Sequence, residues 1–310
     1  MGDVSTAHSY EILTAALKNE FQAGWESAQP MAKELYQEIG SITAENVYPF
    51  LNGIPGFRKW EEGTRRIARN IQILSTSVKN DKWEDTIAIP RTAFDDNLAN
   101  SYRPIAKGLG EQAGIKIDEE IYGLLNNGFD VTTTFDSQYL FSNSHTIGVS
   151  TVDNLSSGAL ADTTFETAYK MLRGFTFKPD NASGARPLNY RWKPMLIVPV
   201  ALETTAKKIV EAALVTTTGG TNVLATLGCT IHVSPYLDAK STTAWYLANV
   251  GTSMKPFMWQ NRQKARLVEK TPFNDSEAWA TDEIIYSADM RGAALATFPW
   301  LVVGSPGTES

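Results

Sequence analysis

A long apolar repeat constrains the fold of this chain more than any other feature of its sequence. Between residues 94 and 124, apolar side chains recur at steps of three and four residues, which is the period of an α-helix with one buried face. Asp95 and Asp96 lie at the start of the repeat and an Asn-Asn-Gly sequence follows its end, as is typical of helix termini. The pattern predicts one long spine helix, or two helices in series.

Four residues inside the repeat oppose helix formation. Pro104 has no amide hydrogen to donate, so it is expected to kink or break the helix. Gly108, Gly110 and Gly114 should weaken it further, because a glycine in a helix interior costs about 1 kcal/mol relative to alanine. If the spine is continuous, about 32 residues would give a rod of roughly 48 Å.

The segment from residue 256 to 305 is typical of strands that build a surface. Polar and apolar residues alternate through 265–270 and again through 283–287, which is the period of strands with one buried face. An aromatic, small-residue strand then closes the segment. It carries none of the residue clusters that catalysis requires, so it favours a shell subunit over an enzyme.

Strands and helices also succeed one another from residue 162 onward, as in a compact α/β unit. Thr163 and Glu166 form a capping-box pattern before a helix that should run through Leu172. The other elements expected here are a buried strand at 195–200, a helix at 202–214, and strands at 229–234 and 243–248.

The first ninety residues divide into a helix and a region of strands. Six apolar residues at helical spacing, with Ser9 as the cap, predict an amphipathic helix: Ile12, Leu13, Ala16, Leu17, Phe21 and Trp25. From residue 41 to 91, turn sequences punctuate strand patterns. Residues 71–79 and 83–89 are predicted to pair as a hairpin about the turn Asn80-Asp81.

Charge and hydropathy limit the classes of function. The 310 residues carry a formal charge of −6, with a pI near 5.3. A protein that grips nucleic acid through its phosphates should show a positive balance. The basic clusters at 58–69 and 262–266 are more typical of solvated faces or subunit contacts. No window approaches the roughly 18 apolar residues of a membrane span, and the first residues do not resemble a secretory signal.

Residues that usually carry catalysis are scattered along the chain. Cys229 lies in a predicted strand with His232 expected on the opposite face, so it is predicted to be a small buried residue and not a nucleophile. The three histidines lack the spacing of a zinc site, and neither a phosphate-binding loop nor a serine nucleophile elbow is present. We expect no cofactor, no metal and no catalytic residue.

Several short motifs occur in a characteristic order along the chain. The motifs are Asn97-Leu98, Tyr102-Arg103-Pro104-Ile105, the run from Leu124 to Phe129, Leu140-Phe141 with Ser144-His145, Pro256-Phe257 with Trp259-Gln260, the basic run Arg262, Lys264 and Arg266, and the run from Arg291 to Ala294. Together they resemble the Mu-like prophage major head subunit family, the gpT-type major capsid proteins of tailed bacteriophages. The resemblance covers about three quarters of the chain and is weakest in stretches rich in Gly, Ser and Thr, where loops tolerate change.

The resemblance implies an α+β fold, the tailed-phage major capsid fold that encapsulins share. It implies an N-terminal arm at 1–40, an extension loop and hairpin at 41–91, a peripheral domain with the spine helix at 92–161 plus 272–310, and an axial α/β domain at 162–271. In that family the arm and the extension loop reach neighbouring subunits. The sequence of the N-terminal helix would equally fit a helix packed on its own subunit.

The function that the resemblance implies is structural. The chain would be a major capsid protein that self-assembles into pentamers and hexamers of an icosahedral shell around double-stranded DNA. Its partners would be copies of itself, a portal, a scaffold or maturation protease, a decoration protein and non-specifically contacted DNA, with no membrane. It would be located in the virion capsid, after assembly in the cytoplasm of the bacterial host.

Exposed aromatic and basic side chains are predicted to make the contacts between subunits. They are Phe57, Trp60, Arg65, Arg66 and Trp83 in the extension region, and Phe21 and Trp25 in the arm. Two other classes of protein remain open. One is an encapsulin-like nanocompartment that holds enzyme cargo in a peptide pocket. The less favoured one is a soluble glycosidase, since adjacent carboxylates such as Glu119 and Glu120 do not converge as that chemistry requires.

Overall fold

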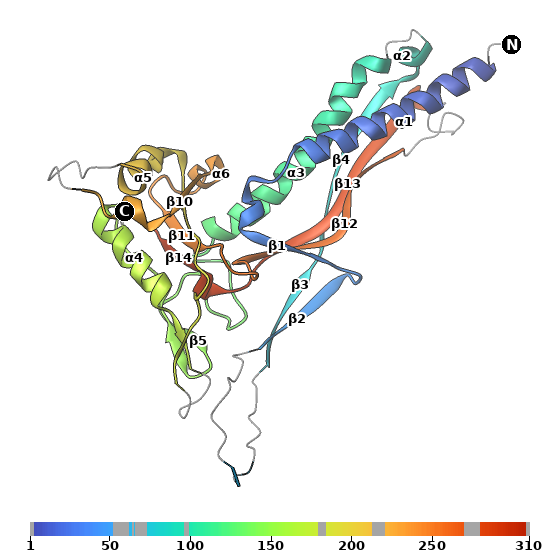
Figure 1. Cartoon of the computed structure of the whole chain (residues 1–310). Coiled ribbons are helices and arrows are strands. Elements are labelled where there is room, and N and C mark those ends of the chain that lie inside the picture. Colours follow the sequence, from blue (N-terminus) through green and yellow to red (C-terminus); the bar gives the residue numbers. More distant parts are fainter. Residues whose placement is uncertain are drawn as a thin grey trace.

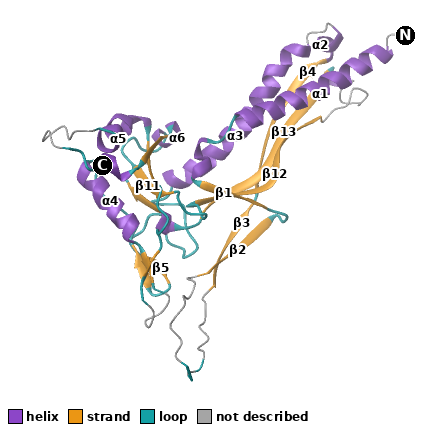
Figure 2. Ribbon diagram, viewed as in Figure 1, coloured by secondary structure: helices purple, strands orange, loops and turns teal. Residues whose placement is uncertain are grey.

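An elongated arm joins a compact module, and a two-stranded ribbon projects from the region between them (Figure 1). The computed structural model describes residues 3–51, 62, 63, 65, 73–95, 99–178, 184–212, 221–269 and 280–307. Helices and strands are mixed in both the arm and the compact module, which confirms the predicted α+β class (Figure 2).

A four-stranded sheet, here called the long sheet, runs along the arm in the order β1-β12-β13-β4. The two central strands are antiparallel, β1 is parallel to β12, and β4 is antiparallel to β13. The alternation is confirmed at 265–269 and 283–287, where buried and more exposed residues alternate along these central strands, and residue 270 lies outside the described residues. The strands are β1 (Tyr36–Gly40), β4 (Asp81–Pro90), β12 (Phe257–Glu269) and β13 (Glu283–Ala296).

Two helices, α1 (Asp3–Ser27) and α3 (Arg103–Asn126), run side by side along the long sheet (Figure 1). The spine helix is confirmed but shorter than predicted, since α3 has 24 residues and is about 36 Å long. Pro104 marks the expected break, because α3 begins at Arg103, and it leaves the rest of the helix without a kink of its own. It occupies the first turn, where a missing amide hydrogen costs nothing, and a short helix α2 (Arg91–Asp95) and a 3-10 turn at 99–102 precede it.

The glycines that were expected only to weaken the spine allow α1 to pack closely against it. A Cβ atom at Gly110 would lie 2.1 Å from the carbonyl oxygen of Phe21, and one at Gly114 would lie 2.5 Å from that of Ala28. On α1, a Cβ atom at Gly24 would lie 2.1 Å from the carbonyl oxygen of Lys107. Bare backbone on both helices is therefore a requirement of this contact.

The N-terminal segment 1–40, which the resemblance described as an N-terminal arm, does not extend away from the subunit in this structure. Leu17 and Phe21 are buried in the core that α1 shares with α3 and the long sheet, and β1 is the edge strand of that sheet. This is the arrangement of a helix packed on its own subunit. The predicted cap is also wrong, because α1 begins at Asp3 and Ser9 lies within it.

The predicted hairpin is wrong in its pairing, although both of its strands exist. β3 (Ile73–Lys79) pairs with β2 (Glu45–Leu51) to form the projecting ribbon, whereas β4 joins the long sheet. Asn80 separates the two strands and is buried. Its amide Nδ2 donates to the carbonyl oxygens of Thr43 (2.9 Å) and Ala44 (3.2 Å), and its Oδ1 accepts from Gln260 Nε2 (2.6 Å).

A second four-stranded sheet, the short sheet, forms the centre of the compact module in the order β10-β9-β11-β14. One face packs against α4 and α5, and the other packs against the end of α3 and the loop that follows it. The sequence predicted the first three of these strands and both helices, and β14 is the strand that was expected to close the segment 256–305. The elements are β9 (Pro194–Val198), β10 (Thr230–Val233), β11 (Trp245–Asn249), β14 (Val302–Ser305), α4 (Asp162–Gly174), α5 (Glu203–Val210) and the single turn α6 (Pro235–Asp238).

Sheet membership redraws two of the predicted boundaries. β12, which was assigned to the axial region 162–271, belongs to the long sheet, and β14, which was assigned with 272–310 to the peripheral region, belongs to the short sheet. The capping box also differs from the prediction. Thr164, and not Glu166, accepts the backbone N–H of Ala161 at the start of α4 (2.9 Å).

Two small ribbons and five 3-10 turns complete the described structure. The ribbons are β5 (His145–Ile147) with β6 (Ser150–Val152) and β7 (Thr176–Phe177) with β8 (Arg186–Pro187). The turns are η1 (Met31–Glu34), η2 (Ala99–Tyr102), η3 (Val200–Leu202), η4 (Leu224–Leu227) and η5 (Pro299–Leu301).

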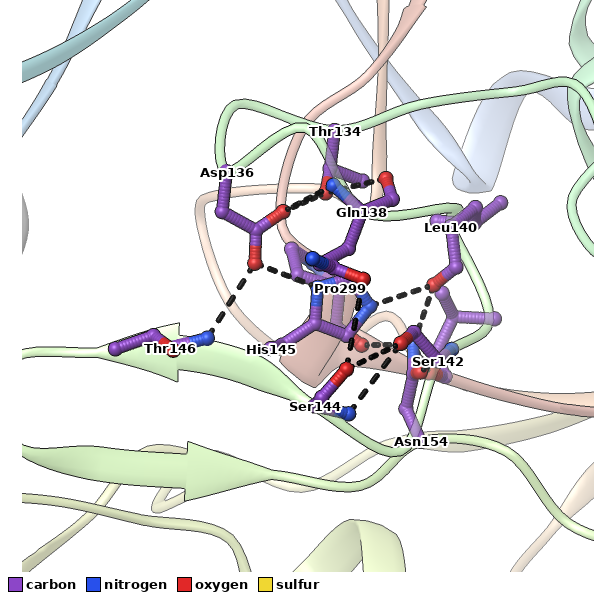
Figure 3. A network of polar contacts seen from close by, with 11 residues as sticks. Thr134, Asp136, Gln138, Leu140, Ser142, Ser144, His145, Thr146, Asn154 and Pro299 are labelled. Atoms are coloured by element: carbon purple, nitrogen blue, oxygen red, sulfur yellow. Dashed lines mark hydrogen bonds and ion pairs between the residues drawn. The ribbon is translucent and has the colours of Figure 1, made fainter.

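A buried polar network connects the loop after α3 to β5 and to residues 299–302 near the end of the chain (Figure 3). Asn154 is fully buried and its Nδ2 lies 2.7 Å, 2.9 Å and 3.1 Å from the carbonyl oxygens of Leu140, Pro299 and Val302. His145, also fully buried, lies with Nδ1 2.8 Å from Asp136 Oδ2 and Nε2 3.1 Å from the Leu140 carbonyl oxygen. The network joins three segments that are distant in sequence.

Acid should weaken this network through Asp136. Burial alone would raise the pKa of Asp136, but hydrogen bonds from His145 and Thr134 lower it to about 2. A carboxyl group with a depressed pKa stabilises the fold above its ordinary pKa and loses that contribution as the pH falls toward 2. The free energy of unfolding should therefore fall by about 2 kcal/mol more between pH 5 and pH 2 in the wild type than in Asp136→Asn. Parallel pH profiles of the two proteins, measured by denaturant unfolding, would contradict this.

A candidate assembly groove

Two of the seven predicted contact residues meet at one groove on the arm. Phe21 from α1 and Trp83 from β4 both line it, although Phe21 is only 2% exposed and so lies deep in its own subunit. Trp25 is partly buried and packs against the core that contains Phe21. Arg65 is exposed and lies outside any strand or helix. The other three, Phe57, Trp60 and Arg66, lie outside the described residues.

The groove lies between α3 and the neighbouring strands β4 and β13, and its volume is about 230 Å³. Its apolar lining comes from five elements, α1, α3, β4, β12 and β13, and consists of Phe21, Trp83, Leu109, Ala113, Ala265, Ala288 and Met290. The spine helix and the strand pattern were predictable, but their meeting at one groove depended on the pairing of β4 with β13.

Trp83 forms one wall of the groove and is held in place by its own subunit. Its ring stacks on Trp259, with centroids 5.8 Å apart and an interplanar angle of 28°. Lys116 Nζ lies 5.8 Å from the centroid of the same ring. Trp83 is opposite Met290 in the register of β4 and β13, and both line the groove. An aromatic side chain that is already ordered loses little entropy on binding.

The polar residues along the groove are Glu84, Asp85, Gln112, Lys116, Glu119 and Asp289. Strand alternation places the side chains of Glu84 and Asp289, which are opposite each other in the register of β4 and β13, on the other face of the long sheet from Trp83 and Met290. Asp85 and Glu119 therefore stand against Lys116 on the groove side. Lys116 bonds Glu119 (3.1 Å), and Asp289 bonds Arg266 (2.9 Å), whose guanidinium lowers the pKa of that carboxyl group.

Within the described residues, Glu84 and Asp85 take part in no salt bridge. Glu84 accepts a hydrogen bond from the hydroxyl of Thr86 (3.0 Å), and Asp85 accepts one from the backbone N–H of Thr86 (2.8 Å).

Metal-ligating and nucleophilic side chains are dispersed over the described residues. Among them, no group of three or more His, Cys, Asp or Glu side chains could hold a metal ion. Cys229 is partly buried, and burial raises the pKa of its thiol to about 12, so the thiol stays protonated and is a poor nucleophile. None of the described helices is long and apolar enough to cross a membrane.

The arrangement of a spine helix on a long sheet, a projecting ribbon and a compact α/β module defines the tailed-phage major capsid fold. The structure is similar to that of the subunit in the procapsid of bacteriophage JBD30, with a TM-score of 0.58 and 20% identity over 97% of this chain and 76% of that chain. The chain belongs to the family described as the Mu-like prophage major head subunit gpT, which it matches over residues 10–179 and 223–308.

Two curated proteins with related names are similar to this chain in sequence. The Mu-like prophage FluMu major head subunit of Haemophilus influenzae is 25% identical over 91% of this chain, and the major capsid protein of Escherichia phage Mu is 23% identical over 94% of it. The chain spans 68% and 71% of these two proteins. It is a major capsid protein of the tailed-phage class, which is a structural family. Neither the nanocompartment nor the glycosidase alternative is favoured by these matches.

Proposed function

We propose that copies of this chain assemble into pentamers and hexamers of an icosahedral shell that encloses double-stranded DNA. The observation that carries the proposal is the β2–β3 ribbon, which projects from the body of the subunit (Figure 1). An isolated two-stranded ribbon is marginally stable in water. One face of this ribbon packs on its own subunit through Phe50 near the outer end and Val78 near Asn80, while Val47 on the other face is 64% exposed. A lattice of identical copies would supply the missing partner surface.

In this proposal the arm is the peripheral domain, the compact module is the axial domain, and the ribbon with residues 52–72 is the extension loop. Closure of a shell makes each subunit multivalent, so weak contacts sum to a stable particle. The net charge of −6 suits a wall that contacts packaged DNA without gripping it. Membership of the family supports further partners: a portal, a scaffold or maturation protease, and a decoration protein, met in the bacterial cytoplasm.

The assembly state of the purified chain tests the proposal. Sedimentation velocity and negative-stain microscopy should show capsomers or closed particles whose amount rises with protein concentration. Replacing residues 52–72 with a short Gly-Ser linker should leave the thermal unfolding of the arm unchanged and abolish the particles, because the projecting contact is lost. A wild-type chain that stays monomeric at every concentration and salt would overturn the proposal, as would particles that form equally well without residues 52–72.

A further inference from the structure

A small apolar cluster joins three parts of the subunit: the ribbon, the arm and the compact module. Phe50 and Val78 come from the ribbon, Met258 comes from the long sheet, and Phe135 comes from the loop after α3, which packs on the short sheet. All four side chains are buried. The ribbon is continuous with the arm through Asn80, and this cluster connects it to the compact module as well.

Aromatic rings make the contact between the ribbon and the compact module. The ring of Phe50 is stacked on Phe135, with centroids 5.2 Å apart, and meets Phe298 edge to face at 5.8 Å. Trp300, directly before β14, lies 5.9 Å from Phe135 and 5.1 Å from Phe298, and it also packs against the core that α4 and α5 cover. Stacked and edge-to-face pairs are the favourable arrangements of aromatic rings. Phe50 is therefore connected through two ring pairs to the interior of the compact module.

The position of Phe50 gives this contact leverage. The ribbon slants from the arm toward the side of the compact module (Figure 1), and the rise of a β-strand places Phe50 roughly 20 Å from Asn80. At that distance a movement of about 1 Å corresponds to a rotation of only about 3°.

The other contacts between the arm and the compact module lie where the two parts meet, so they act over a shorter lever. One is the packing of the end of α3 against the short sheet. Another is the salt bridge between Lys193 and Glu34, at 2.8 Å, whose side chains are 48% and 54% exposed. An exposed pair of this kind contributes little to stability, so it restrains the angle weakly.

We propose that the ribbon is a brace that fixes the angle between the arm and the compact module, and that the ring of Phe50 is the contact that closes it. With the ring in place, the arm, the ribbon and the compact module form a closed triangle. Without it, the compact module can rotate about the end of α3. This role is exercised within a single subunit and goes beyond the proposed shell.

Distances between spin labels on the arm and on the compact module test the brace. The full chain carries Cys229→Ala to remove the native thiol, with labels at Lys18→Cys on α1 and Thr204→Cys on α5, which are exposed positions. Labelled chain is diluted with an excess of unlabelled chain, so that only distances within one subunit are measured. The chain with Phe50 intact should give one narrow distance distribution.

Phe50→Ala should broaden this distribution or add a second distance. The population of displaced subunits should rise by at least about tenfold, because truncation of a buried phenylalanine costs more free energy than a factor of ten requires. Hydrogen exchange at the β4–β13 and β9–β11 ladders should stay as in the wild type, which shows that both parts remain folded.

Val47→Ala is the matched control, because Val47 lies on the same strand with its side chain on the opposite face, 64% exposed. It should leave the distances unchanged. Phe135→Ala removes the same contact from the side of the compact module, and adding it to Phe50→Ala should broaden the distribution no further, since both changes open one contact.

Phe50→Leu keeps an apolar side chain without the ring pairs, so it provides a milder variant if Phe50→Ala does not fold. A distance distribution in Phe50→Ala, or in Phe50→Leu where only that variant folds, that is as narrow as with Phe50 intact would overturn the brace. Equal broadening in Val47→Ala would overturn it as well. These distances are measured within one chain, so either result leaves the proposed assembly standing.

Discussion

Gly110→Ala should detach α1 from the spine helix and destabilise the subunit by about 3 kcal/mol. The added methyl carbon would lie 2.1 Å from the carbonyl oxygen of Phe21 and 2.7 Å from the backbone nitrogen of Trp25. Neither atom belongs to a flexible side chain, so the two helices must separate and give up packing around Leu17 and Phe21. Denaturant unfolding followed by tryptophan fluorescence measures the loss.

Gly123→Ala is the matched control, because the same substitution on the same helix meets no atom within 4 Å. Alanine has the higher helix propensity, so this variant should be more stable than the wild type by up to about 1 kcal/mol. If the free energy of unfolding falls in Gly110→Ala and rises in Gly123→Ala, the loss at Gly110 is due to helix packing and not to helix propensity. If both variants gain stability, the close approach of α1 and α3 is not a feature of the folded subunit.

Asn154→Asp should cost on the order of 4 kcal/mol at neutral pH, which is the largest effect expected of an isosteric change in this chain. The wild-type amide donates toward the carbonyl oxygens of Leu140, Pro299 and Val302 from a fully buried position. A carboxylate there would face those oxygens with no hydrogen to offer. Because protonation relieves part of the penalty, the difference from wild type should shrink as the pH is lowered.

Asp153→Asn makes the reverse exchange one residue earlier, at an exposed position, and should change stability by less than about 0.5 kcal/mol. Thermal unfolding of both variants at pH 7 and pH 5 provides the comparison. A small effect of Asn154→Asp at pH 7 would mean that water or a shifted backbone satisfies the three carbonyl groups.

The sequence was informative where a pattern repeats within one element. The spine helix, the central strands of the long sheet and most strands of the compact module follow from periodicity, because burial of one face imposes it on every residue. Pro104 marks the expected break, because α3 begins at Arg103, whereas Gly110 and Gly114 were interpreted only as weak points and in fact allow α1 to approach. Their effect depends on position within the helix and on what packs against it, and neither is visible in a single sequence.

Pairing between distant segments could not be predicted in the same way. The strands on either side of Asn80 have correct boundaries within a few residues, yet their partners are β2 and β13, and local turn chemistry does not encode that choice. Phe21 and Trp83 were predicted as contacts between subunits from helical spacing, aromatic character and the family resemblance, and that prediction stays open. The fold buries Phe21 and partly buries Trp83 at one groove, which no local pattern indicated.

A single residue, Asn80, connects strand β3 of the ribbon to strand β4 of the long sheet. Tension applied to the outer end of the ribbon is transmitted to the subunit at a point where one side chain bonds Thr43, Ala44 and Gln260. Asn80 also directly precedes the first residue of β4 that pairs with β13, so a load on the ribbon reaches the edge strand of the long sheet through these bonds.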